Sequence, residues 1–520
     1  MERGNVRRVV LTQGPRVRRG LLMTLVVVMP LIFLVDVLND PVNTPKLAFL
    51  IAIVSLTLAV RAVEFACGRS GDGSGGLLVP ALAVVLPLGI AWLLSPYRGW
   101  ALLGQYNRYQ GFLPYLVLAA FGLLAAEAFR GRALTLAWAL LIAGAGAGAY
   151  ALLETFGLSP FIWNAGGGAK TLGLTQASST LGNPNFAGGF MCVVVPVGVG
   201  VWLTDRERRD RASVCLALTV VGWLVSFSQG AWLAGAAGLA VTLGIVLAPR
   251  LPWARVAGFA IAALLAVAGV GVVIAAMVGG PHDGDRTTAD VRAWAWEAAI
   301  DMTADHPVVG RGPNSFAVEG IQHRTKDEGI QADYQTDDPH SVFFSYLTAA
   351  GVLGGLGFVI LAGWIIRRAL TVGSEAPLAA AFAGAAVAYL AQSLLSFDEL
   401  STRLALWTAL AGLAATLPRH LDATIGSRVP APRADDDHGP PTLSRVVALL
   451  AAAVVLVSGC WYAGTIMVAD RHYLRGVRAA QDNLAEEAVD AFDAAIAVRP
   501  DHYYRANAGN RIGELGARRD

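Results

Sequence analysis

Thirteen apolar runs of about 20 residues each are the feature that most restricts how this 520-residue chain can fold. A helix needs roughly 20 mostly apolar residues to cross a bilayer, and lipid tolerates only helices and closed barrels. The chain is 55% hydrophobic and only 15% charged. It is too apolar to bury everything in one core, because single cores stop growing near ~250 to 300 residues. The sequence therefore predicts an all-α polytopic membrane protein with about 12 to 13 transmembrane helices.

The predicted spans have boundaries that are set only to within a few residues. The first follows a basic segment, residues 1–19, and lacks a small-residue cleavage site, so we expect it to be retained as a span. The spans lie near residues 20–38, 46–66, 76–95, 111–129, 133–153, 184–203, 212–227, 229–248, 256–278, 341–366, 376–396, 403–417 and 446–468.

The positions of Lys and Arg predict the orientation, because positively charged connections resist translocation. With the N-terminus in the cytoplasm, every second connection carries arginine. The arginines expected on the cytoplasmic side are Arg69, Arg130, Arg132, Arg206, Arg208, Arg209, Arg211, Arg250, Arg255, Arg367, Arg368, Arg419, Arg428 and Arg433. We therefore expect a multi-pass protein with a cytoplasmic N-terminus, a large extracytoplasmic loop at 280–339 and an extracytoplasmic C-terminus.

The same pattern divides the chain into five segments. These are a basic cytoplasmic N-terminus (1–19), a transmembrane domain (20–417), a Pro- and Asp-rich cytoplasmic linker (418–444), a last transmembrane helix (445–469) and an extracytoplasmic tail (470–520).

The tail has the spacing of a tetratricopeptide helix pair, in which small residues let two helices approach and proline follows the second. The residues are Gly476, Ala488, Phe492, Ala495 and Pro500. Such repeats bury their faces by stacking, usually at least three together. We therefore expect an incomplete repeat that is poorly ordered alone and that offers a surface for a protein partner.

Composition also argues against some functions. A net charge of +2 gives no reason to expect nucleic acid as a partner. Four cysteines lie far apart in or beside apolar runs, which indicates neither disulfides nor a metal site. We expect no metal and no cofactor.

The large loop is acidic, with twelve Asp and Glu against five Lys and Arg from Pro281 to Pro339. Such a loop does not attract anions by its overall field, so phosphate recognition requires individually placed arginines. Arg292 stands one helical turn before Trp296. It either stacks on that ring as a cation–π pair or presents its guanidinium to a phosphate.

His340 stands directly before an apolar span, after Asp337, Asp338 and Pro339. A histidine there is a candidate general base or a residue that caps the helix. The two aspartates either orient its ring or belong to the turn before Pro339.

Six short motifs occur in one order along the chain. They are GNPN (182–185), FSQGAW (227–232), RAWAW (292–296), DHPVVGRGPNSF (305–316), PHSVFFSYLTAAGVLG (339–354) and SFD (396–398). In this order, with the long loop between the same spans, the sequence resembles the O-antigen ligase and polymerase superfamily over residues 20–417.

The resemblance implies a metal-independent glycosyltransferase on the outer face of the plasma (inner) membrane. It would move a saccharide from an undecaprenyl-diphosphate carrier, a substrate and not a cofactor, to a lipid, glycan or protein acceptor in cell-envelope polysaccharide biosynthesis. Membrane lipids are the other expected partners. In the family, an arginine one turn before a tryptophan binds the donor pyrophosphate, and Arg292 and Trp296 match that pair. A histidine that opens the next span acts as the base, and His340 matches it.

The sequence departs from the family where the family commonly reads SRG. Here Ser228, Gln229 and Gly230 follow one another, so a second phosphate-binding arginine is missing and Gln229 offers only neutral hydrogen bonds. The charge has three candidate replacements, Arg286, Arg311 and Arg403. The alternative for Arg403 is ion pairing with its neighbours Asp398 and Glu399.

Two readings outside glycosyl transfer stay open: a small-solute transporter, for example of inorganic carbon, and a membrane-anchored scaffold for envelope assembly. A transporter calls for ionisable groups and broken helices at midplane, and the sequence indicates neither. Ligase, polymerase and protein O-glycosyltransferase activities share a donor, so these residues do not separate them.

Overall fold

The computed structural model describes residues 2–69, 71, 73–74, 76–159, 170–171, 174–279, 288–324, 336–416 and 443–517. These residues form two compact units. Unit 1 comprises Met1–Gly71, Gln105–Tyr109 and Arg428–Asp520, and unit 2 comprises Asp72–Gly104 and Gln110–Ser427. Almost all of the predicted linker, 418–444, lies outside the described residues.

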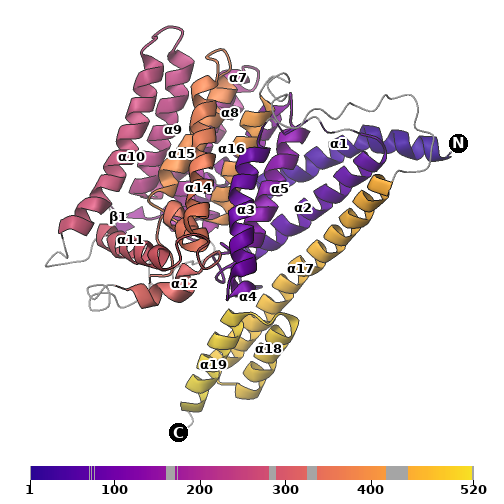
Figure 1. The fold of residues 1–520 in the computed structure, drawn as a ribbon, viewed down its shortest axis with the longest axis vertical. Coiled ribbons are helices and arrows are strands. Elements are labelled where there is room, and N and C mark those ends of the chain that lie inside the picture. Colours follow the sequence, from indigo (N-terminus) through magenta and orange to yellow (C-terminus); the bar gives the residue numbers. More distant parts are fainter. Residues whose placement is uncertain are drawn as a thin grey trace. The chain divides into compact units, whose positions relative to one another are not determined.

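Unit 2 is a helical body in which a two-residue antiparallel pair of strands, β1 with β2, is the one described ladder (Figure 1). Its first half contains α3 (Leu78–Leu94), α4 (Arg98–Leu103), α5 (Phe112–Ala128), α6 (Ala133–Thr155), β1 (Lys170–Thr171), β2 (Leu174–Thr175), the 3-10 helix η1 (Ser179–Leu181), α7 (Pro184–Thr204) and α8 (Arg209–Val225). Its second half contains α9 (Gln229–Leu247), α10 (Ala254–Gly279), α11 (Thr288–Asp305), α12 (Phe316–Glu319), η2 (Gly320–His323), α14 (Val342–Thr371), α15 (Pro377–Ser393) and α16 (Leu400–Ala415).

Unit 1 contains five helices in its described part. They are α1 (Glu2–Val28), α2 (Asn43–Ala66), α17 (Leu443–Gln481), α18 (Ala485–Val498) and α19 (His502–Ala517).

Seven described helices are long and apolar enough to cross a membrane: α2, α6, α7, α9, α10, α14 and α17. Four shorter apolar helices accompany them, α3, α5, α15 and α16. All of these coincide with spans expected from the sequence. The prediction of an all-α polytopic membrane protein is confirmed.

The first predicted span, 20–38, differs from the structure. Helix α1 begins far upstream, at Glu2, and ends at Val28, and residues 29–42 form turns and coil. This stretch contains Pro30 and Pro41, which lack an amide donor, and Asp36, whose φ is +62°. Hydropathy averaged over the window concealed these helix breakers.

Helix α14 is also broken, whereas the sequence indicated a continuous span over 341–366 and no broken helix. Ala350 and Gly351 leave helical geometry, and Gly351 has a φ of +60°. The loop before the helix replaces the lost backbone bonds: Val352 N–H donates to the Pro307 carbonyl at 2.7 Å, and Gly312 N–H donates to the Ala349 carbonyl at 2.8 Å. A side chain at 351 would collide with Pro307, so only glycine suits this position.

The arginine-bearing connections of unit 2 meet at one end of its helices. Arg130 donates to the Gly73 carbonyl at 3.5 Å, and Arg255 donates to the Val372 carbonyl at 2.7 Å. Gly76 lies against the guanidinium of Arg368. This grouping is what the positive-inside rule requires of one membrane face; which face it is stays a prediction.

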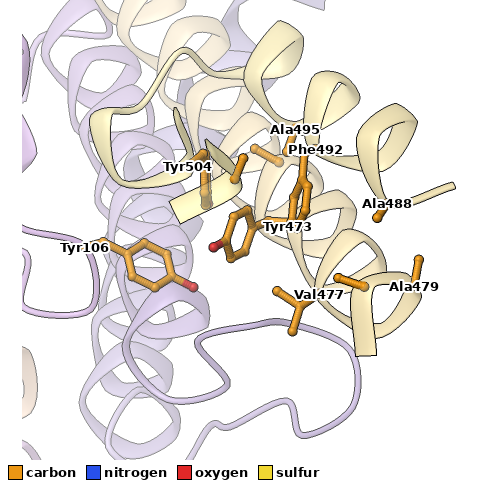
Figure 2. Close-up of a cluster of buried hydrophobic side chains, with 11 residues drawn as sticks. Tyr106, Tyr473, Val477, Ala479, Ala488, Phe492, Ala495 and Tyr504 are labelled. Carbon is orange, nitrogen blue, oxygen red and sulfur yellow. The ribbon is translucent and has the colours of Figure 1, made fainter. Parts of the chain in front are cut away.

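Unit 1 contains a cluster of buried hydrophobic side chains that includes Tyr106, Tyr473, Phe492 and Tyr504 (Figure 2). Asp470 accepts hydrogen bonds from the Tyr106 hydroxyl, from the Tyr504 hydroxyl at 3.2 Å and from the Asp40 backbone N–H at 3.1 Å. Phe492 of α18 packs so closely on Gly476 of α17 that a Cβ there would lie 2.5 Å from the ring. Residues 470–517 are thus packed helices within the chain, and the tetratricopeptide assignment itself stays a prediction.

Candidate functional site

The short segment after α15, residues 395–398, is the point at which the sequence motifs of unit 2 meet. The His340 ring lies edge-on to the Phe397 ring, with centroids 5.3 Å apart. Phe186 also packs on Phe397, with ring centroids 5.0 Å apart. Phe186 lies in the first turn of α7, directly after the GNPN motif. These contacts bring three motifs to one end of the helices, the end opposite the arginine-bearing connections.

His340 is held in a strained backbone conformation. Its φ is +53°, a region that costs a non-glycine residue of the order of 1 to 3 kcal/mol and that histidine, asparagine and aspartate enter more readily than others. The buried carboxylate of Asp338 accepts the His340 backbone N–H at 2.8 Å. Asp338 therefore stabilises the turn before α14, and a role in orienting the His340 ring stays a prediction.

Arg292 reaches the same segment from α11. Its Nε donates to the Leu395 carbonyl at 2.9 Å, two residues from the phenylalanine that His340 touches. Burial lowers the pKa of Arg292, yet a guanidinium stays charged at any physiological pH. The nearly buried Trp296 packs its ring on Phe344 of α14 at 5.1 Å, which anchors α11 beside the start of that helix.

The FSQGAW motif meets GNPN across the starts of α7 and α9. Ser228, the residue before α9, donates from its hydroxyl to the Asn185 side-chain oxygen at 2.9 Å. Its side chain makes no capping hydrogen bond to the first turn of α9. Gln229 is the first residue of α9 and its side chain is exposed. The position that holds arginine in the resemblance is thus a neutral amide at a helix N-terminus.

Arg311 is compensated by a neighbouring acid. Its Nε lies 2.7 and 2.9 Å from the two carboxylate oxygens of Glu319. This hydrogen-bonded pairing raises the pKa of Arg311. Because the Arg311 guanidinium is already hydrogen-bonded to one carboxylate, it is a poor candidate for binding a second anion such as a phosphate.

Arg403, in α16, is 1% exposed. Its Nε lies 4.0 Å from a carboxylate oxygen of Asp398, and its guanidinium carbon lies 4.8 Å from the centre of the Tyr115 ring. Asp398 also accepts the Tyr389 hydroxyl at 2.7 Å. This is the geometry of the ion-pairing alternative. The third candidate, Arg286, lies outside the described residues.

Sequence reasoning missed Gln392, in the last turn of α15. Its side chain is 6% exposed, and its carbonyl oxygen is buried with no hydrogen-bond partner among the described residues. A single amide within the apolar run 376–396 was the available signal, since polar groups inside spans tend to be functional.

A small cavity is lined in part by the Asp338–Pro339 turn. The residues that line this cavity include Asp338, Gln110, Asn314, Ser345, Thr348 and Tyr115. Within the described ranges, no group of three His, Cys, Asp or Glu side chains is arranged to hold a metal ion. Metal independence stays a prediction.

The fold and the site define a multi-pass membrane protein with its motif residues gathered at one end of the helices. Residues 214–359 match a family described as O-Antigen ligase. The match contains Gln229, Arg292, Trp296, Arg311 and His340, and the resemblance seen in the motifs is confirmed over this segment. No curated protein matches the chain. The family supports a membrane enzyme of glycosyltransferase type in envelope polysaccharide synthesis.

Proposed function

We propose that this protein transfers a saccharide from an undecaprenyl-diphosphate carrier to a lipid, glycan or protein acceptor at the outer face of the plasma (inner) membrane. The observation that carries the proposal is the meeting of Arg292 and His340 on one segment. Arg292 bonds to the Leu395 carbonyl and the His340 ring packs on Phe397. Family membership of the matched segment supports the reaction class.

His340 acts as the general base in this mechanism. Its neutral imidazole takes the proton from the acceptor hydroxyl, and the hydroxyl oxygen attacks the anomeric carbon of the donor sugar. The bond between that carbon and the phosphate oxygen breaks, and undecaprenyl diphosphate leaves with the electron pair. The strained turn at Asp338 fixes the position of the base before substrate arrives.

Arg292 stabilises the negative charge that develops on the leaving diphosphate. A guanidinium offers several N–H donors in a rigid fork, and the Leu395 carbonyl holds its Nε in place. Partial burial strengthens its attraction for a phosphate oxygen, because the local dielectric constant is low.

The break in α14 gives no support to the transporter alternative. Its freed backbone groups bond to residues 307–312 of the chain itself, so the break is a docking point for the preceding loop.

Glycan analysis of a deletion strain tests the proposal. The strain is complemented with wild type, with His340→Ala or with His306→Ala, a control histidine in the same loop, and lipid-linked saccharide is compared with finished polymer. We expect lipid-linked saccharide to accumulate in the deletion and in His340→Ala only. Unchanged glycans in the deletion would instead favour a transporter or scaffold.

A further inference from the structure

Helix α1 is anchored at the C-terminal end of α2 by two arginines and a glycine. The Arg7 Nε donates to the Cys67 carbonyl at 3.0 Å, and the buried Arg18 lies 3.2 Å from the Glu64 carboxylate. A Cβ on Gly14 would lie 2.9 Å from the Glu64 side chain. Arg7 and Arg18 are about 16 Å apart along the helix, yet both reach the last turn of α2 and its cap. The first half of α1 therefore lies across the end of α2.

This end of unit 1 is strongly basic. Residues 7–28, 61–69 and 443–450 contain one acid, Glu64, and eight arginines: Arg7, Arg8, Arg16, Arg18, Arg19, Arg61, Arg69 and Arg445. Glu64 is fully buried and already faces two of them, Arg18 at 3.2 Å and Arg69 at 3.9 Å. A Cβ on Gly68 would lie 3.1 Å from the Arg7 guanidinium and 3.8 Å from that of Arg445. Within these three segments, no acid remains to balance the other arginines.

The outer face of α1 combines arginine with exposed apolar side chains. Arg8 and Arg16 are exposed, and within the part of the chain that the structure describes neither side chain makes an ion pair or hydrogen bond. With 3.6 residues per turn, Arg8, Arg16 and Arg19 project within about 80° of one another around the helix. Val9 and Val17 come next around it and are 58% and 50% exposed. This is the pattern of a helix at the boundary between lipid headgroups and acyl chains.

A face that only keeps a helix in water is expected to mix charges of both signs. The described side chains of α1 include no acid, so the single sign favours a surface of the opposite charge. The second half of α1 does not share this exposure, because Leu22, Leu25 and Val26 are fully buried. The helix is thus fixed at one half and presents its basic face at the other.

We propose that the face of α1 around Arg8 and Arg16 binds the headgroups of anionic phospholipids at the bilayer surface. The guanidinium fork matches phosphate oxygens. A bilayer is the favoured partner because α1 is anchored on α2, a helix long and apolar enough to cross a membrane, and because Val9 and Val17 need an apolar neighbour that a soluble anion does not offer. The interaction is independent of the proposed glycosyl transfer.

Hydrogen exchange of α1, followed by mass spectrometry in the full-length protein, tests the proposal. The protein is placed in nanodiscs of phosphatidylcholine or of phosphatidylglycerol with the same acyl chains. A lipid that binds the docked helix stabilises it against opening. We expect the amides of residues 8–14 to exchange about thirtyfold more slowly in phosphatidylglycerol, roughly fivefold for each exposed arginine. High salt should remove most of this difference.

The main variant replaces both exposed arginines, Arg8→Gln with Arg16→Gln, and we expect it to exchange in both bilayers at the wild-type phosphatidylcholine rate. Arg471→Gln with Arg475→Gln is the matched control, since it removes two exposed arginines of α17 in the same unit and should keep the difference. Arg18→Gln breaks the buried pair with Glu64 and should speed exchange equally in both bilayers.

Four outcomes would overturn the inference. The first is equal exchange of the wild type in the two bilayers. The second is a phosphatidylglycerol effect that survives in the Arg8→Gln, Arg16→Gln protein, because other arginines would then cause it. The third is faster exchange of that protein in phosphatidylcholine, which would make the two arginines structural, as Arg18 is. The fourth is slowing by inorganic phosphate in phosphatidylcholine nanodiscs, which would assign the face to a soluble anion.

Discussion

The Asp470 cluster of unit 1 and the site end of unit 2 both bury polar groups, but those around Asp470 are hydrogen-bonded, whereas two at the site end have no described partner. In unit 1, Asp470 accepts from two tyrosine hydroxyls and a backbone N–H, and the Tyr109 hydroxyl lies 2.6 Å from that of Thr44. At the site end of unit 2, the Gln392 oxygen and the Trp296 N–H have no described partner, and α9 starts without a cap. A satisfied cluster stabilises a fold, whereas unsatisfied groups are available to a ligand.

The comparison predicts that substitutions at the site remove activity and spare the fold, whereas substitutions in satisfied clusters do the reverse. Five changes test this, from the largest expected effect to the smallest.

His340→Asn and Arg292→Ala are expected to reduce transfer by at least about a hundredfold, because the first removes the general base and the second removes the group that stabilises the leaving diphosphate. Asparagine tolerates the positive φ of residue 340, so the turn survives while the base is lost. Rates in membranes are compared at equal protein level. Normal turnover in His340→Asn would exclude this residue as the base.

Arg403→Leu is expected to destabilise unit 2 by about 3 to 5 kcal/mol, because it leaves the buried Asp398 carboxylate without its ion-pair partner. The measurement is protein level and thermal aggregation in detergent. A stable, inactive Arg403→Leu protein would point to a direct role in donor binding instead.

Asp470→Leu is expected to destabilise unit 1 by roughly 1 to 3 kcal/mol for each donor left without an acceptor, without strict additivity. Tyr504→Phe removes one of those donors and serves as the milder control. Protease susceptibility of residues 482–517 reports the change, and equal resistance in all three proteins would contradict the role given to this cluster.

Asp40→Ala is expected to cost about 0.5 to 2 kcal/mol, because Asp40 accepts the N–H groups of Val42, Asn43 and Thr44 at the start of α2. Asp40→Asn retains an acceptor oxygen and should lose less. Burial raises the pKa of Asp40 above 3.8, so the folded state holds the proton more tightly than the unfolded state.

The contribution of Asp40 to stability is therefore greatest at low pH and falls as pH rises through its folded pKa. Thermal unfolding of the two variants and of wild type from pH 4 to 7 checks the sign. A wild-type profile identical to that of Asp40→Asn would show that Asp40 does not cause this dependence.

Chelation is expected to have the smallest effect, because the proposed chemistry uses only side chains and the lipid-linked donor. Transfer by the purified protein is measured with and without EDTA. Inhibition that a divalent ion reverses would contradict the metal-independent mechanism.

Hydropathy and arginine positions predicted most of the fold, because the bilayer imposes both helix length and the side on which positive charge lies. They failed where local breakers act inside an apolar window, as at Pro30 and Gly351. The spacing of one helical turn between Arg292 and Trp296 holds in the structure, because both residues lie in α11.

The candidate site was less accessible to sequence reasoning. Motif order indicated Arg292 and His340, but their common contact with residues 395–397 depends on tertiary packing. The ion pair of Arg311 with Glu319 and the burial of Arg403 beside Asp398 likewise required the fold. Gln392 belongs to none of the six motifs, and it is distinguished only by its buried side-chain oxygen, which has no hydrogen-bond partner among the described residues.

The most direct test of the central claim is transfer by the purified full-length protein in proteoliposomes, with an undecaprenyl-diphosphate-linked saccharide as donor. Wild type is compared with His340→Asn, Arg292→Ala and the control His306→Ala. We expect product and released undecaprenyl diphosphate with wild type and with the control, and neither with the two site variants. Equal product from all four proteins would contradict it.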